Sequence, residues 1–98
     1  MSELQFSWDP KKARTNERKH GVSFEEAESV FLDEEALQID DPDHSDRETR
    51  FLLLGYSYRL RIVLVCHCLL EEEGVIRLIS ARKATKPERR QYNKQVRR

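Results

Sequence analysis

The sequence predicts a single α+β domain over residues 1–98, in which two N-terminal helices and one C-terminal helix accompany an antiparallel meander sheet. A length of 98 residues is close to the commonest domain size. Helix start signals stand near both ends of the chain, and apolar blocks separated by short polar turns lie between them. These observations predict the element order β-α-α-β-β-β-β-α.

The N-terminal part is expected to form a short strand and a capped helix. Residues 6–8 alternate apolar and polar side chains, which is the pattern of a strand. Asp9 can cap free backbone N–H groups and Pro10 fits the first helical position, so a helix is expected to run to about His20. Gly21 then suits a left-handed C-cap.

A second helix is predicted by a capping box. Ser23 and Glu26 have the spacing at which each side chain can bond the backbone N–H of the other residue. Apolar residues follow at helical spacing and form one face: Phe24, Ala27, Val30 and Phe31. A helix beginning just after Ser23 is therefore expected to pack that face on the core.

The middle of the chain predicts the remaining strands of the sheet. Residues 36–40 have the pattern of a strand, and residues 40–46, rich in Asp around a Pro, can only form a loop. Apolar blocks then predict strands at 50–57, 61–70 and 75–82. Because their connections are short, these strands are expected to form consecutive antiparallel hairpins.

The last element is expected to be a helix over residues 86–95. Thr85 and Glu88 have the spacing of a second capping box, and Pro87 lies in the first turn. Residues 82–98 carry eight Lys or Arg, with Glu88 as their single acidic residue. This basic end contrasts with the whole chain, in which 18 basic residues balance 18 acidic ones.

Charge is sorted along the chain in a way that favours a polyanionic ligand. Residues 9–20 hold five basic and two acidic residues, whereas residues 25–48 hold eleven acidic and one basic. A local positive patch can bind nucleic acid even when the net charge is zero. No stretch approaches the roughly 20 apolar residues of a membrane span, and the N-terminus lacks a signal-peptide pattern. Two cysteines form no disulfide framework, so a cytoplasmic location is expected.

Candidate functional residues gather where the last strand ends. Arg82 and Lys83 leave the edge of the sheet, and the helix that begins after Thr85 has N-terminal amides that attract anions. Arg89 and Tyr92 lie on neighbouring turns and can share a face near Arg82. Arginines and a phenol suit a phosphodiester, because Arg can clamp a phosphate and Tyr can stack on a base or move a proton. The alternative is a solvated basic helix with a packed Tyr92.

A second candidate group lies on the first helix. His20 stands at its end beside Lys19, with Lys12 two turns earlier. A histidine near neutral pH is a natural proton carrier. The alternative is that His20 only caps the helix C-terminus.

No metal or cofactor is expected. Residues 66–68 (Cys-His-Cys) put both thiols on one strand face and His67 on the other, and no second ligand pair stands at zinc spacing. Buried structural cysteines are therefore expected. The acidic loop could offer a cation Asp41, Asp43, His44 and Asp46, but it lacks the Gly and the closing Glu of a calcium loop.

Three stretches of the chain resemble a known family. They are FSWDPKKARTNERKHGVSFEEAESVF, DDPDHSDRETRFLLLG and RLISARKATKPERRQY, and they span residues 6–92. The chain is similar to the BrnT toxins of BrnT–BrnA type II toxin–antitoxin modules, a branch of the RelE-like ribonucleases. The resemblance implies a compact RelE-like domain that cleaves mRNA, free or ribosome-bound, without a metal and so inhibits translation and growth. It also implies a hetero-oligomer with a BrnA-like antitoxin that binds DNA.

The resemblance also implies particular site residues. RelE-type enzymes commonly use an arginine at the end of the last strand and a tyrosine on the terminal helix, which Arg82 and Tyr92 match. The lysines that many of them carry on central strands are missing from residues 50–70. Lys12, Lys19 or His20 could supply the general base instead.

The resulting expectation is a metal-independent endoribonuclease. Its catalytic residues would be Arg82, Tyr92, His20 and Arg89, and its substrate-binding residues Lys12, Lys19, Lys83, Thr85 and Arg90. Two non-catalytic alternatives remain open, namely an RNA- or DNA-binding module that uses the same basic surface, and a protein-interaction partner.

Overall fold

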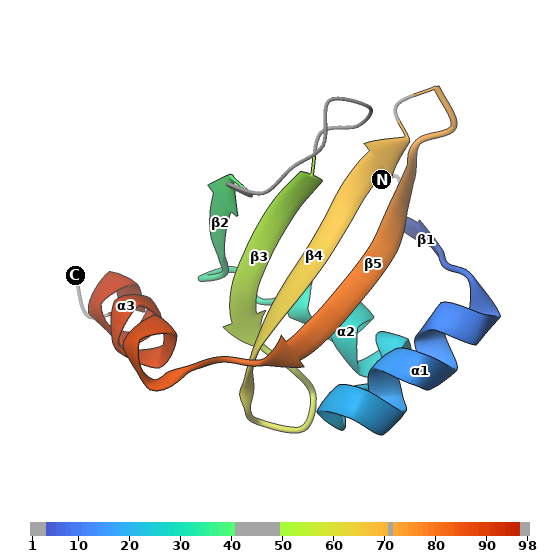
Figure 1. The fold of residues 1–98 in the computed structure, drawn as a ribbon. Coiled ribbons are helices and arrows are strands. Elements are labelled where there is room, and N and C mark those ends of the chain that lie inside the picture. The colour runs from blue at the N-terminus through green and yellow to red at the C-terminus, as the bar shows by residue number, and fades with distance from the viewer. Residues whose placement is uncertain (1–3, 41–49, 71, 97–98) are drawn as a thin grey trace.

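The computed structural model describes residues 4–40, 50–70 and 72–96, and its elements follow the predicted order (Figure 1). The elements are β1 (Gln5–Ser7), α1 (Pro10–His20), α2 (Phe24–Val30), β2 (Leu37–Asp40), β3 (Arg50–Tyr56), β4 (Ile62–Leu70), β5 (Val75–Lys83) and α3 (Lys86–Val96). The α+β class is confirmed, and the predicted boundaries lie within about two residues of those observed. Within the described residues, no helix is long and apolar enough to cross a membrane.

The five strands form one sheet in the order β1-β5-β4-β3-β2. Strands β2 to β5 are the predicted antiparallel meander. The short β1 differs, because it pairs in parallel with residues 75–77 of β5 and makes the sheet mixed. This pairing leaves the edge of β5 uncovered by a strand beyond Arg77.

The helices begin and end at their predicted caps. The Asp9 carboxylate accepts a hydrogen bond from the backbone N–H of Lys11, and Gly21 closes α1 with a left-handed φ of 71°. Ser23 Oγ accepts from the N–H of Glu26 at 3.0 Å, but the Glu26 carboxylate does not complete the predicted box. It binds Ser57 and Arg61 instead, because burial of this carboxylate requires stronger donors.

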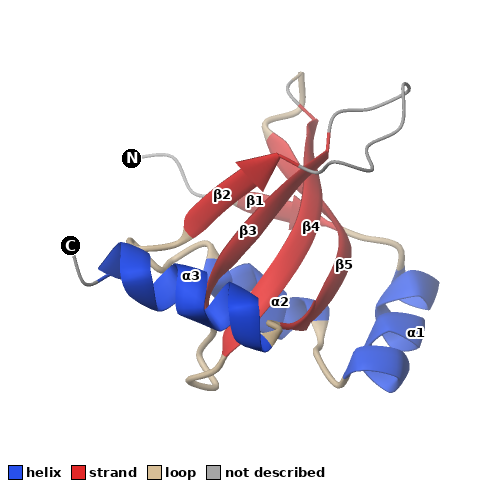
Figure 2. Ribbon diagram, turned by 60° about the vertical axis from the view of Figure 1, so that its left-hand side comes forward, coloured by secondary structure: helices blue, strands red, loops and turns tan. Residues whose placement is uncertain are grey.

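Helices cover both faces of the sheet. On the face of α2, the buried core consists of Val22, Phe24, Ala27, Val30, Leu53, Val63, Val65, Leu78 and Ala81. On the opposite face, α3 packs Tyr92 against a smaller cluster of Leu54, Ile62, Leu64 and Ala84. Figure 2 shows α2 behind the strands and α3 in front of them. The second face is called the α3 face below.

His67 lies buried on the α2 face, between the rings of Phe31 and Phe51, whose centroids are 4.9 and 5.9 Å away. Its Nδ1 has no hydrogen-bond partner within the described parts of the chain. Cys66 and Cys68 are buried on the α3 face, as expected, since they pair with Leu52 and Arg50. Burial lowers the pKa of His67 below its ordinary value of 6.5 because it disfavours the imidazolium.

The buried His67 predicts a loss of stability in mild acid. The unfolded chain gains a proton as the pH falls below about 6.5, while the folded chain does not until lower pH. The free energy of unfolding should therefore fall by up to about 1.4 kcal/mol per pH unit below that value. Urea unfolding of wild type and His67→Leu at pH 7.5 and 5.5 measures how the free energy of unfolding changes with pH. If it falls as steeply in the variant as in wild type, His67 is not the cause.

Candidate functional site

Asn16 fastens α1 to the exposed edge of β5. Its side-chain amide donates to the carbonyls of Ala81 at 2.8 Å and Val22 at 2.9 Å, and its Oδ1 accepts from the N–H of Ala81 at 3.0 Å. The side chain is 7% exposed. Asn16 thus satisfies the backbone groups that a neighbouring strand would otherwise bond. It fixes the distance between α1 and β5.

A cleft of about 460 Å³ lies between α1 and β5. Its lining residues are Asp9, Lys11, Lys12, Thr15, Asn16, Lys19, His20, Ile79 and Ser80. The structure therefore brings together three residues that the sequence had placed at a site: Lys12, Lys19 and His20. Lys12 and His20 stand about 12 Å apart along the helix.

A β-bulge in β5 forms the other wall of the cleft. Cys66 of β4 pairs with Ser80, but the next residue, His67, pairs with Leu78, so Ile79 is the extra residue. Bulges redirect side chains and are frequent next to active sites. Sequence reasoning did not assign Ile79, Ser80 or Thr15 to the site. No local signal in the sequence marks the bulge.

The charge of the cleft suits an anion. Three lysines, Lys11, Lys12 and Lys19, line it, against a single acidic residue, Asp9. The Asp9 carboxylate is already engaged in capping α1. A phosphodiester in the cleft would therefore meet excess positive charge, with the imidazole of His20 available to transfer a proton.

Arg82 is held by an acidic partner of the same segment. Its guanidinium forms two hydrogen bonds to the Glu88 carboxylate, at 2.9 and 3.0 Å. The hydrogen bond from Arg82 lowers the pKa of Glu88, so the pair is ionised at neutral pH. Glu88 also accepts from the N–H of Thr85, whose Oγ1 accepts in return from the N–H of Glu88, which confirms the predicted capping box.

This arrangement corrects one expectation about α3. Its N-terminal amides were expected to attract an external anion near Thr85, but the Glu88 carboxylate already occupies that position. A substrate phosphate could accept the same two hydrogen bonds from Arg82 only by displacing the Glu88 carboxylate. Lys83 and Arg90 are exposed nearby and do not line the cleft.

Arg89 and Tyr92 do not form a common clamp with Arg82. The Arg89 guanidinium donates to the carbonyl of Ala84 at 2.9 Å. The Tyr92 hydroxyl donates to Asp33 at 2.5 Å, and the ring is 3% exposed. Burial, together with the hydrogen bond to Asp33, raises the pKa of Tyr92 well above its ordinary value of 10.0. In this structure Tyr92 fastens α3 to the sheet, which is the packing alternative described above.

Ser80 and Arg82 share one face of β5, because side chains alternate along a strand. Ser80 pairs with Cys66 and Arg82 with Leu64, and both partners belong to the α3 face. Ser80 also lines the cleft. Arg82 therefore projects from the same face as a cleft residue, two positions further along the strand.

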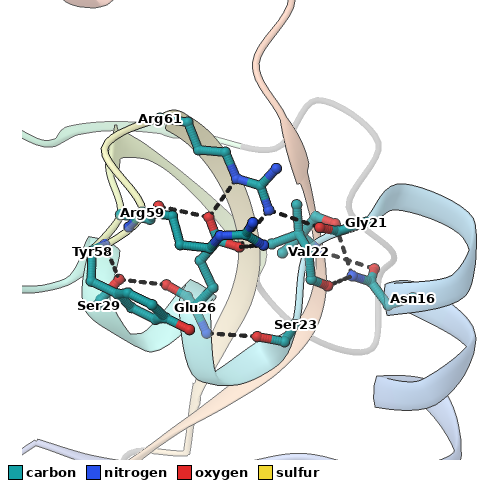
Figure 3. Close-up of polar contacts among 11 residues, drawn as sticks. Asn16, Gly21, Val22, Ser23, Glu26, Ser29, Tyr58, Arg59 and Arg61 are labelled. Atoms are coloured by element: carbon teal, nitrogen blue, oxygen red, sulfur yellow. Dashed lines mark hydrogen bonds and ion pairs between the residues drawn. The ribbon is translucent and has the colours of Figure 1, made fainter.

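A buried ion pair supports the end of α1 that carries His20 (Figure 3). Glu26, 1% exposed, accepts from Arg61 Nε at 2.7 Å and from its terminal nitrogen at 2.6 Å. The same guanidinium donates to the carbonyl of Gly21 at 2.8 Å, and Ser57 Oγ donates to Glu26 at 2.6 Å. Burial disfavours the charged carboxylate, yet these hydrogen bonds outweigh it and lower the pKa of Glu26. The network joins the β3–β4 turn to the residue that follows His20.

Metal ligands were not expected, and the described ranges contain no group of three or more His, Cys, Asp or Glu side chains that could hold a metal ion. The alternative cation ligands Asp41, Asp43, His44 and Asp46 lie outside the described residues.

Comparison with known proteins adds two findings. A family model described as "Ribonuclease toxin, BrnT, of type II toxin-antitoxin system" matches residues 8–88. The fold is similar to the crystal structure of the ribonuclease toxin BrnT of Brucella abortus, with a TM-score of 0.65 and 27% sequence identity, covering 86% of this chain and 100% of that chain. A search of curated protein sequences gave no significant match.

Proposed function

Because the chain belongs to the BrnT family of ribonuclease toxins of type II toxin–antitoxin systems, we propose that it is an endoribonuclease that cleaves RNA in the cleft between α1 and β5. One observation carries this location. The cleft combines three lysines with His20, and so offers both charge stabilisation and proton transfer to one phosphodiester.

The proposed reaction is transesterification within the RNA. The 2′-hydroxyl oxygen attacks the adjacent phosphorus and the bond from phosphorus to the 5′ oxygen breaks. The products are a 2′,3′-cyclic phosphate and a free 5′-hydroxyl. His20 takes the proton of the attacking hydroxyl or supplies one to the leaving oxygen. Lys12 and Lys19 stabilise the negative charge that develops on the phosphorane.

Arg82 takes part as a second source of positive charge on the same sheet face. Its ion pair with Glu88 holds the guanidinium in a fixed orientation, and a substrate phosphate can exchange with the Glu88 carboxylate. Arg89 contributes charge beside it, and Lys83 and Arg90 bind the flanking backbone of the RNA. Thr85 is omitted because its N–H and hydroxyl oxygen are engaged with Glu88. Tyr92 is omitted from proton transfer because its hydroxyl proton is donated to Asp33.

Membership of a type II system implies an antitoxin partner. We propose that a BrnA-like protein forms a hetero-oligomer with this chain and covers the basic cleft with acidic and apolar groups. Growth inhibition would then follow from cleavage of mRNA, free or on the ribosome, whenever the antitoxin is lost.

The test is cleavage of a short RNA by purified protein in excess EDTA. Cleavage is expected to persist in the chelator, because lysines, arginine and histidine supply the charge and the proton transfer. A 2′-deoxy nucleotide at the scissile position should abolish the product, and mass spectrometry should find the cyclic phosphate.

Two results would contradict the proposed metal-independent cleavage. Loss of activity in EDTA with recovery in Mg²⁺ would mean a metal-dependent reaction and direct attention to the acidic loop. RNA binding without cleavage would identify a non-catalytic binding module.

A further inference from the structure

The bulge in β5 changes which side chains share a sheet face. In a regular strand, residues of the same parity lie on one face, so Arg77 would lie opposite Ser80 and Arg82. The extra residue Ile79 reverses that parity. Arg77 pairs with Cys68, and Ser80 pairs with Cys66, two residues earlier on the same face of β4. Arg77, Ser80 and Arg82 therefore all project from the α3 face.

Two core residues of β5 independently confirm that the strand is bulged at Ile79. Leu78 and Ala81, three positions apart, both belong to the buried core on the α2 face. That is possible in a strand only when one residue between them is bulged. Arg50 of β3 also pairs with Cys68, which places it on the α3 face in the same cross-strand row as Arg77.

Arg77 differs from the other arginines of this region in its contacts. Arg82 is bound to Glu88 and Arg89 to a backbone carbonyl. Arg77 is exposed, and within the described residues it has neither an ion pair nor a side-chain hydrogen bond. Its guanidinium can therefore bind an external anion without giving up an intramolecular partner.

We infer that Arg77 forms a second phosphate-binding site, for an RNA phosphate next to the one that is cleaved. The inference rests on the proposed function, since it takes Ser80 to mark the cleaved position. Because Ile79 is bulged, Arg77 and Ser80 pair with β4 residues only two positions apart, so they stand about 7 Å apart along the sheet. A single-stranded RNA that leaves the cleft along β5 would bring a neighbouring phosphate to Arg77, and a planar guanidinium binds such a phosphate through two hydrogen bonds.

The experiment compares RNA binding by wild type and Arg77→Gln across a salt series. The probe is a short 2′-O-methyl oligonucleotide, which cannot undergo attack by its 2′ oxygen. Arg77→Gln should bind it about tenfold more weakly at low salt. The slope of log affinity against log salt should become shallower by about 0.7, the value for one phosphate contact on a single strand. Arg77→Lys should restore the slope because it keeps the charge.

A matched control and a minimal substrate separate this site from the cleft. Arg14→Gln removes the same charge from an exposed position of α1 that does not line the cleft, and should leave the slope unchanged. A dinucleotide with one phosphodiester should be cleaved equally by wild type and Arg77→Gln. If the two proteins share the same salt slope, or if Arg14→Gln lowers it equally, the inference is wrong. If wild type cleaves neither the dinucleotide nor an unmodified short RNA, the proposed function is wrong, while the binding series still decides whether Arg77 contacts phosphate.

Discussion

Replacing His20 with alanine is expected to lower RNA cleavage by about 10²–10⁴-fold, the usual contribution of a general acid or base. His20 lines the cleft together with the lysines, and an imidazole is the side chain that most often acts as a general acid or base. The binding of the uncleavable oligonucleotide should change little, because the ammonium groups of Lys12 and Lys19 remain. Single-turnover cleavage and equilibrium binding measure these two effects separately.

Arg18→Ala is the matched control for His20→Ala. Arg18 is an exposed basic residue near the end of the same helix, and it does not line the cleft. The Arg18→Ala protein should cleave RNA at nearly the wild-type rate. Thermal unfolding of both variants should show that α1 remains folded. A His20→Ala protein that cleaves normally would move proton transfer away from the cleft. Comparable losses in both variants would point to a general effect of positive charge.

Replacing Glu26 with alanine is expected to destabilise the fold by about 3 kcal/mol. Removing one partner of a buried ion pair leaves the other without compensation, at a cost of about 3–5 kcal/mol. The lower end applies because the Arg61 side chain is 27% exposed. For a domain of this size, the loss should lower the melting temperature by more than about 10 °C. Urea unfolding at pH 7 gives the free energy directly.

The double variant Glu26→Leu with Arg61→Met is the control for this prediction. It removes both charges together and should lose much less stability than Glu26→Ala, since apolar replacements of a buried pair are often nearly neutral. The pH dependence gives a second check. The folded pKa of Glu26 is lowered, so its contribution is present above about 4.5 and is lost as the pH falls below that value. A Glu26→Ala protein as stable as wild type would mean that the network adds nothing to the fold.

Local signals in the sequence determined the helices and most strand positions. Asp9, Pro10 and Gly21 bound α1 correctly because a cap acts on backbone groups within a few residues. The Thr85–Glu88 box placed α3 for the same reason. Apolar blocks separated by short turns predicted the meander of β2 to β5, because short connections favour neighbouring antiparallel strands.

The same local reasoning reached three of the nine residues that line the cleft. Lys12, Lys19 and His20 are close in sequence and share a helix, so they could be grouped from spacing alone, and the structure brings them to one cleft. The partner of Glu26 could not be found in this way, since Arg61 lies 35 residues further along the chain. The hydrogen bond between Tyr92 and Asp33 could not be found from local spacing either, since the two residues are 59 positions apart.

Only the tertiary structure decided which residues face one another across the sheet. Asn16 meets Ala81, 65 residues later, because β1 covers only the first part of β5 and leaves an edge for α1 to satisfy. The bulge at Ile79 moves Arg77 to the face of Ser80 and Arg82, whereas regular alternation would put it on the opposite face. Caps and apolar periodicity depend on neighbours in the chain and can be read there. Pairing register and edge contacts depend on hydrogen bonds between distant segments, which exist only once the sheet has formed.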